Sequence, residues 1–308
     1  MNQLLQHTLS QSISFEGKGL HTGQYARMTV EPAPVDCGIK FVRSDIGDSA
    51  VVEALAENVS NTARSTTLSC GGVSVSTVEH ILSALTGMGI DNAIVRMDNV
   101  EVPILDGSAR PYVEAVLKAG ICAQDAPRKL IRLTEEIEVK DDRSGSFIRI
   151  TPSEKPEIEV TVDFGSKVLG VQKAGWSMDT DYAAEIGPCR TFVFFHEIEF
   201  LAKNGLVKGG DMDNAIVVVE HPVTDEQVEG VCNALGFEKQ SVSENGYLNN
   251  LELHFPDECG RHKLLDLIGD LRLCGGWLAA KVTAYKPGHG INTNAAKAVR
   301  QALSGREA

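Results

Sequence analysis

Arg261-His-Lys-Leu-Leu-Asp-Leu-Ile-Gly-Asp-Leu271 combines an apolar and a polar stripe of one predicted helix. Residues four apart share a helical face, so His262 and Asp266 can bind one metal ion, and Asp270 extends their stripe by another turn. The positions that would seat this helix on a core are apolar: Leu264, Leu265, Ile268 and Leu271. An ordinary amphipathic helix with a solvated His–Asp pair has the same spacing, so the motif alone is not specific.

A helix pattern that leads through glycine into a strand occurs in both halves of the chain. Residues 262–273 precede a strand at 277–285, and residues 77–86 precede a strand at 91–95. The two halves also open alike, with alternating segments and a proline-bearing turn, at 12–15, 26–30 and 38–42 and again at 137–139, 146–150 and 158–162. We therefore expect two α+β domains, 1–124 and 125–308, joined within the polar stretch 120–129. A metal would lie where the halves face each other.

The composition limits the class of protein. The chain has 308 residues, 43% of them hydrophobic, which is long enough for two cores. A formal net charge of -13 disfavours nucleic acid as a partner, whereas a small anion needs only a local basic cluster. The seven cysteines include no C-x-x-C pair, which argues against a disulfide framework and a thiolate zinc site. Without a signal peptide or a run of ~20 apolar residues, we expect a soluble cytoplasmic protein.

His80, in Ser76-Thr-Val-Glu-His80, is the candidate ligand of the first half. Two histidines and one carboxylate are the ligand count of a catalytic zinc site, and Glu79 beside His80 is where a base for activated water would lie. Glu79 has a structural alternative, because Ser76 and Glu79 also have the spacing of a capping box at a helix start. The local sequence leaves both roles open.

His289 follows the last predicted strand and lies between two glycines. We expect it on a loop, where a histidine can act as a general acid or stabilise an oxyanion, although an exposed turn histidine is the alternative. The glycine-rich segment 17–23 lacks the G-K-[ST] ending of a P-loop, so we interpret it as a turn between strands. His21 within it can face either the site or solvent.

Phenylalanine is concentrated in the segment 190–201, at Phe192, Phe194, Phe195 and Phe200. Core packing is the usual explanation of such a cluster. The alternative is an apolar slot for a long alkyl chain, if this segment projects from the fold beside the site.

Together these motifs resemble UDP-3-O-acyl-N-acetylglucosamine deacetylase, the zinc amidase of lipid A biosynthesis in Gram-negative bacteria. The similarity extends in order along nearly the whole chain, through segments 17–23, 76–80, 89–92, 102–109, 190–192, 261–271 and 284–290. Several ordered motifs are more specific than any one of them. The resemblance implies two similar α+β domains, each a layered sheet, with paired helices packed between the sheets of the two halves.

The resemblance also implies a role for each candidate residue. His80, His262 and Asp266 would bind Zn2+, with Fe2+ as an alternative in the cell, and Glu79 would be the general base. The remaining catalytic groups would be His289 with its partner Asp270, and Thr191 near the oxyanion. Substrate contacts would come from Lys263 near the diphosphate and from an apolar insert at about 192–210, which contains Phe192 and Phe194. The segment 220–250 is longer and more polar than the family pattern, so its local structure stays open.

The expected reaction removes the N-acetyl group of UDP-3-O-acyl-N-acetylglucosamine and releases acetate, in a monomeric cytoplasmic enzyme whose partner is this UDP-sugar. Two other classes remain. A non-haem iron oxygenase also uses two histidines and one carboxylate, but usually with a close His-x-Asp pair. A sugar-nucleotide-binding protein with a structural metal would usually have four protein ligands. The His-x-x-x-Asp spacing and the three-ligand count favour the hydrolase.

Overall fold

Two mixed β-sheets dominate the computed structural model, which describes residues 4–198, 209–210, 214–235, 238, 240–248 and 252–305. The first sheet contains, in spatial order, β2 (Ile13–Lys18), β3 (Tyr25–Pro32), β9 (Ala93–Met97), β4 (Ile39–Arg43) and β5 (Val51–Glu53). The second contains, in spatial order, β12 (Ile137–Asp141), β13 (Ser146–Pro152), β18 (Trp277–Tyr285), β14 (Glu157–Asp163) and β15 (Val171–Ser177). A short strand, β11 (Leu130–Arg132), pairs with the start of β18.

The two sheets have the same topology. The central strand β9 pairs antiparallel with β3 and parallel with β4. Its counterpart β18 pairs antiparallel with β13 and parallel with β14. Alternate residues of β3 and β14 are buried, as expected for strands with one face on a core. The predicted α+β class and the repeated plan of the two halves are confirmed.

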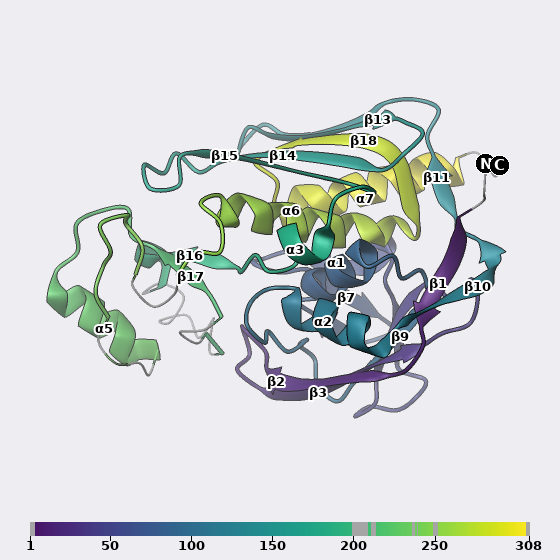
Figure 1. Cartoon of the computed structure of the whole chain (residues 1–308), viewed down its shortest axis with the longest axis horizontal. Coiled ribbons are helices and arrows are strands. Elements are labelled where there is room, and N and C mark those ends of the chain that lie inside the picture. Colours follow the sequence, from purple (N-terminus) through teal and green to yellow (C-terminus); the bar gives the residue numbers. More distant parts are fainter. Residues whose placement is uncertain are drawn as a thin grey trace.

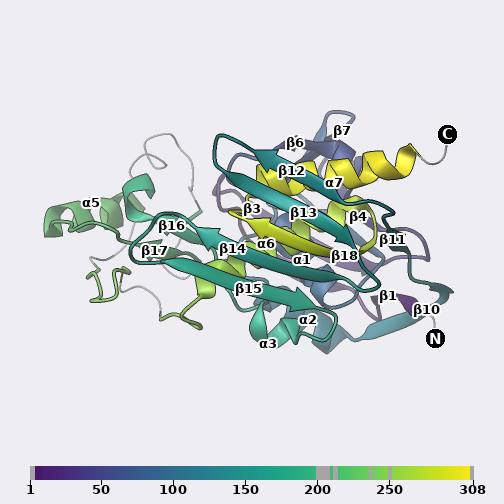
Figure 2. The same ribbon diagram turned by 90° about the horizontal axis from the view of Figure 1, so that it is seen from above.

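The helices α1 (Glu79–Gly87), α6 (Glu258–Leu271) and α7 (His289–Ser304) lie between the two sheets (Figure 1). Seen from above, the second sheet covers α1 and α6 (Figure 2). Residues 79–86 of α1 are all buried, and so are twelve of the fourteen residues of α6. Helices that are covered on every side need apolar residues around most of their circumference, so the few polar side chains on them stand out as functional candidates.

Helices α1 and α6 approach each other most closely at Gly269. A Cβ atom at this position would lie 2.1 Å from the carbonyl oxygen of Glu79. Only glycine fits such a separation without displacing a backbone. The contact holds the first turn of α1, with Glu79 and His80, against the part of α6 that carries Asp266 and Asp270.

Smaller elements complete the two halves. A three-stranded sheet is formed by β6 (Val59–Asn61), β7 (Thr67–Cys70) and β8 (Val73–Ser76). Helix α2 (Arg110–Ala119) also lies between the sheets, packed against α1 and β2, and the short helix α3 (Tyr182–Glu185) contacts α2 (Figure 1). A 3-10 turn, η2 (Arg272–Cys274), follows α6. The stretch 120–129, expected as a linker, contains β10 (Ile121–Pro127), which pairs antiparallel with β1 (Leu5–Leu9). The limits 1–124 and 125–308 stay predictions.

The end of the chain differs from expectation at His289. This residue is the first of α7 and does not lie on a loop. Its neighbour Gly288 is extended, and the positive φ in this turn belongs to Lys286 at 51°. The turn is therefore made at Lys286, before Gly288 and Gly290, and Gly290 is part of helix α7.

A separate element extends to one side of the molecule (Figure 1). It contains β16 (Phe192–Phe194), parallel to β17 (Ile216–Val218), and α5 (Asp225–Leu235). One small apolar cluster lies within it, and a second joins its two strands to Leu169 and to Cys259 of α6. The predicted insert at about 192–210 falls here, but residues 199–208 of it, including Phe200, lie outside the described residues. Part of the polar segment 220–250 forms α5.

No helix among the described residues is both long enough and apolar enough to cross a membrane.

Gly269→Ala should lower the free energy of unfolding by about 1–3 kcal/mol, the typical range for overpacking a core. The added methyl group meets the Glu79 carbonyl and must push α1 away from α6. Denaturant unfolding followed by circular dichroism measures the loss. Gly230→Ala is the matched control, because Gly230 lies in α5 with open space around its Cβ position, and alanine there should cost nothing. Equal stability of both variants would contradict the close contact.

Candidate metal and catalytic site

Three buried side chains converge between α1 and α6. Nε2 of His80 lies 3.6 Å from Oδ1 of Asp266, and Nε2 of His262 lies 3.4 Å from the same oxygen. The two imidazole rings meet edge to face, with centroids 5.0 Å apart. One ligand atom from each residue lies within 4.8 Å of the other two. A single cation between them can therefore contact all three residues.

The chemistry of these residues fits a metal with nitrogen and oxygen ligands. Nδ1 of His262 lies 3.0 Å from the carbonyl oxygen of Cys189, which places its proton on Nδ1 and leaves the Nε2 lone pair for a metal. Burial lowers the pKa of His262 to about 4, so the ring stays neutral at physiological pH. Oδ1 of Asp266 is buried without a hydrogen-bond partner. A bound cation would supply the missing partner of this buried oxygen.

Lys263 forms an ion pair with the carboxylate of Asp266. Its Nζ donates to Oδ2 of Asp266 at 2.8 Å, and it lies 5.4 Å from the centre of the Phe192 ring. Burial opposes the charge on Asp266, but Lys263 and the nearby histidines together outweigh burial and hold the pKa of Asp266 well below its usual value. About a fifth of the Lys263 side chain, 19%, is exposed.

Glu79 does not form the capping box that its spacing from Ser76 allowed. Helix α1 begins at Glu79 with no side-chain cap, and Ser76 lies in β8, where its amide donates to the carbonyl of Val100. Oε2 of Glu79 accepts a hydrogen bond from the amide of Thr66 at 3.0 Å. Sheet pairing at Ser76 thus competes successfully with the helix cap. Burial raises the pKa of Glu79, which suits a group that must accept a proton.

His289 and Asp270 form a buried pair beside Glu79. Nδ1 of His289 lies 3.0 Å from Oδ2 of Asp270, and Nε2 lies 3.9 Å from Oε1 of Glu79. Burial alone would lower the pKa of His289, but the carboxylates of Asp270, Glu79 and Asp266 outweigh it and raise the pKa to about 9. The imidazolium is therefore the stable form at neutral pH, with Nε2 directed at the side of the site where Glu79 lies.

Two residues that the sequence analysis did not single out organise these groups. The hydroxyl of Thr66 donates to Oδ1 of Asp270 at 2.6 Å, while the amide of the same residue bonds to Glu79. The side-chain amide of Asn292 donates to Oδ2 of Asp270 at 2.9 Å. Thr66 precedes a short strand and Asn292 lies within α7, so neither has a local sequence pattern that marks it.

The remaining candidates border the metal cluster. The ring of Phe192 lies 6.5 Å from that of His262, and Phe194 packs against Phe192 at 6.1 Å. Thr191 directly precedes Phe192, and its amide donates to the carbonyl of Gly107. His21 lies in the turn between β2 and β3, as predicted for the glycine-rich segment. Its Nε2 is buried and unpartnered, and burial lowers its pKa although the nearby carboxylate of Glu101 opposes this shift.

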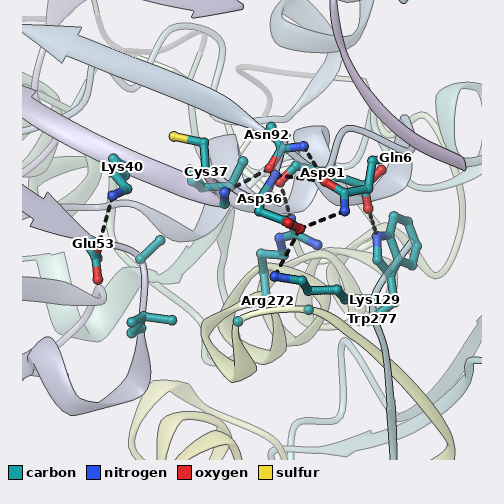
Figure 3. A pocket seen from close by; sticks show the side chains of 16 residues that line it. Gln6, Asp36, Cys37, Lys40, Glu53, Asp91, Asn92, Lys129, Arg272 and Trp277 are labelled. Carbon is teal, nitrogen blue, oxygen red and sulfur yellow. Dashed lines mark hydrogen bonds and ion pairs between the residues drawn. The ribbon is translucent and has the colours of Figure 1, made fainter. Parts of the chain in front are cut away.

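A separate cavity of about 230 Å³ lies between β4 and the start of β18. Figure 3 shows its charged lining residues in pairs, with Lys40 beside Glu53 at one end and Asp36 beside Lys129 towards the other. Asn92 and Gln6 bond to each other within the wall. None of the candidate residues lines this cavity, so it is not part of the site between α1 and α6.

Comparison with known proteins gives one family. The model of the UDP-3-O-acyl N-acetylglycosamine deacetylase family matches residues 6–231 and 231–301. The UDP-3-O-acyl-N-acetylglucosamine deacetylase of Saccharophagus degradans is 44% identical over 291 residues, which cover 93% of this chain and 87% of that protein. Its counterpart from Teredinibacter turnerae is 43% identical, with the same coverage.

Another group of relatives is longer. The bifunctional enzyme LpxC/FabZ of Porphyromonas gingivalis is 40% identical over 303 residues, which cover 98% of this chain and 66% of that protein. A protein of the same name from Chlorobaculum tepidum is also 40% identical, with 96% and 64% covered. This chain thus spans just under two thirds of the length of these bifunctional relatives.

Replacing His262 or Asp266 by alanine should weaken Zn2+ binding by more than the ~10–100-fold that loss of an outer-shell partner costs. Each variant removes one of three converging ligand atoms. Competition with a chromogenic chelator measures the affinity. His221→Ala is the control, because His221 is exposed and should keep the affinity of the unmodified protein. Unchanged affinity in both ligand variants would place the metal elsewhere.

Proposed function

This chain belongs to the UDP-3-O-acyl N-acetylglycosamine deacetylase family, and we propose that it hydrolyses the acetamide of UDP-3-O-acyl-N-acetylglucosamine to UDP-3-O-acyl-glucosamine and acetate, an early step of lipid A biosynthesis. One observation carries this proposal: the ligand atoms of His80, His262 and Asp266 converge beside Glu79 and a cationic His289. The sequence predicted this set from three separate segments, 76–80, 261–271 and 284–290.

A divalent metal held by His80, His262 and Asp266 would supply Lewis acidity, which polarises a carbonyl and makes water more acidic. Neutral imidazole and carboxylate suit zinc, and they also accept iron, so we propose Zn2+ with Fe2+ as an alternative. The three-ligand count leaves room for water or substrate, as in catalytic and not structural zinc sites.

Glu79 is the general base in this proposal. Its buried carboxylate has a raised pKa, and the Thr66 amide fixes one of its oxygens, so the other oxygen can accept a proton from the attacking water. His289 faces Glu79 across the site and carries a proton at neutral pH. It would stabilise the negative oxygen that develops on the acetamide, and either His289 or Glu79 would deliver a proton to the departing amine.

The other candidates would hold the substrate. Thr191, at the start of the phenylalanine-rich strand, would donate to the developing oxyanion. Lys263 would meet the diphosphate through the exposed part of its side chain. Phe192 and Phe194, which pack on each other next to His262, would guide the acyl chain along the projecting element.

We also propose the setting of the reaction. The domains would be 1–124, with Glu79 and His80, and 125–308, with the remaining ligands and His289. All seven cysteines are free, which agrees with a reducing compartment, so we propose a cytoplasmic enzyme that acts as a monomer. Neither an oxygenase nor a non-catalytic binding protein matches the names of the relatives.

Acetate release from UDP-3-O-acyl-N-acetylglucosamine tests the proposed reaction directly. The purified protein should release acetate, a chelator should abolish the release, and Zn2+ should restore it. Oxygen consumption with an oxoacid cosubstrate would instead favour the oxygenase. Metal-replete protein that binds the UDP-sugar without releasing acetate would favour the binding protein.

Glu79→Gln should lower kcat by ~100-fold or more, the typical effect of removing a general base. The amide oxygen still accepts from the Thr66 amide, so the fold and the metal content should be unchanged. Steady-state acetate release and metal analysis measure the two quantities. Near-normal turnover would remove Glu79 from the chemistry.

His289 should give the pH profile an alkaline limb. If its protonated form acts in the reaction, kcat falls as the pH rises through about 9, where the imidazolium loses its proton. His289→Gln should lower kcat at neutral pH and remove this limb, because glutamine does not titrate. A limb that persists in the variant would assign it to another group. The profile is measured with metal at saturation throughout.

A further inference from the structure

The loop 187–191, which we call the Cys189 loop, passes the metal cluster without contributing a ligand. The carbonyl of Cys189 lies 3.0 Å from Nδ1 of His262. Two residues later the amide of Thr191 donates to Gly107, and the carbonyl of Thr191 accepts from Ile216. One short backbone segment thus contacts a proposed metal ligand and carries the proposed oxyanion donor.

Between these two positions, Arg190 is held by Glu258 in the first turn of α6. Oε1 of Glu258 accepts from the Arg190 amide at 3.0 Å and from Nε at 2.9 Å. Oε2 accepts from Nη2 of Arg190 at 3.2 Å and from the amide of His254 at 2.7 Å. Nη2 of Arg190 also donates to the carbonyl of Glu252 at 2.6 Å. Both side chains are buried, with 6% of Arg190 and 0% of Glu258 exposed.

The position of Glu258 on α6 gives this ion pair a direct geometric link to the site. Glu258 precedes His262 by four residues, so the two lie on one face of the helix, a turn apart. The same helix therefore provides the imidazole and, one turn earlier, the carboxylate that anchors the loop opposite that imidazole. Any shift of Arg190 moves the Cys189 carbonyl relative to His262.

We propose that Glu258 and Arg190 are positioning residues: their ion pair fixes the Cys189 carbonyl against Nδ1 of His262 and sets Thr191 beside the reacting amide. Neither residue touches metal or substrate. The inference deepens the proposed function and rests on the metal site formed by His80, His262 and Asp266.

Two physical arguments favour positioning over a contribution to stability alone. Buried ion pairs often add little net stability, because the cost of desolvation offsets their attraction. A gain in stability therefore does not explain why Arg190 and Glu258 make so many hydrogen bonds. Groups that orient a ligating histidine, in contrast, commonly change metal affinity or activity by ~10–100-fold. Burial alone would raise the pKa of Glu258, but hydrogen bonds from Arg190 and from the His254 amide keep it below the usual value. The anchor is therefore ionised at neutral pH.

Glu258→Gln in the full chain tests the proposal. Glutamine keeps the shape of the side chain but presents an NH2 group to donors that now face a carboxylate oxygen. We expect Zn2+ affinity to fall ~10–100-fold by chelator competition. With metal at saturation, kcat should fall while KM stays near that of the unmodified enzyme, because Thr191 would contact the reacting amide and not the nucleotide.

Two controls separate positioning from loss of charge and loss of stability. Asp257→Asn makes the same charge change one residue earlier, where the Asp257 carboxylate pairs with Arg261 and accepts no hydrogen bond from the Cys189 loop. Asp91→Asn breaks another buried ion pair, Arg128–Asp91, with 4% and 7% of the side chains exposed. The first should change nothing. The second should lower Tm while Zn2+ affinity stays the same.

Arg190→Lys is a second variant, in case Glu258→Gln does not fold. It keeps the cation but cannot make all the side-chain hydrogen bonds of the guanidinium. It should also weaken Zn2+ binding and lower kcat. The proposal is overturned if either folded variant matches Asp257→Asn, or if its affinity is unchanged while Tm falls, as expected for Asp91→Asn. If the unmodified protein binds no Zn2+ through His262, the proposed function fails instead.

Discussion

The close approach of α1 and α6 at Gly269 is the constraint on which the site depends. The two helices come from different halves of the chain, and each is covered by a sheet with the same strand order. Because Gly269 has no side chain, the first turn of α1 can rest on α6. That contact places an acid and a histidine from one half next to the acids and the histidine of the other. Neither half contains the complete set.

A site assembled in this way gathers like charges out of water. The carboxylates of Glu79, Asp266 and Asp270 lie close together, and burial disfavours all three charges. Lys263 on Asp266, and His289 on Asp270, offset part of that repulsion. Among these carboxylate oxygens, Oδ1 of Asp266 is buried and has no hydrogen-bond partner. The protein thus keeps this oxygen free where a cation would bind, whereas Oδ2 of Asp266 and both oxygens of Asp270 accept hydrogen bonds.

The sequence was sufficient to predict the α+β class, the repeated plan and most strands of the two large sheets, because these follow from alternation and turn residues. It also selected His80, His262 and Asp266, because i,i+4 spacing on an apolar helix and ordered family motifs are visible in one dimension. It failed where tertiary contacts compete with local patterns. Ser76 pairs in a sheet instead of capping a helix, and His289 begins a helix instead of ending a loop. Thr66 contributes through hydrogen bonds to Glu79 and Asp270 that no local sequence pattern predicts.

The Cys189 carbonyl has a consequence for how this protein can be studied. It is a main-chain atom, so every residue placed at 189 would supply the same acceptor to His262. Alanine substitution at 189 therefore leaves this contact in place, and a comparison of sequences cannot show whether it is present. Chemical editing of the backbone reaches it: an ester in place of the amide between residues 189 and 190 would weaken the acceptor while all side chains stayed unchanged. The same edit would also remove the Arg190 N–H that donates to Glu258. The acceptor for Nδ1 of His262 is thus set by the backbone conformation and not by the identity of a side chain.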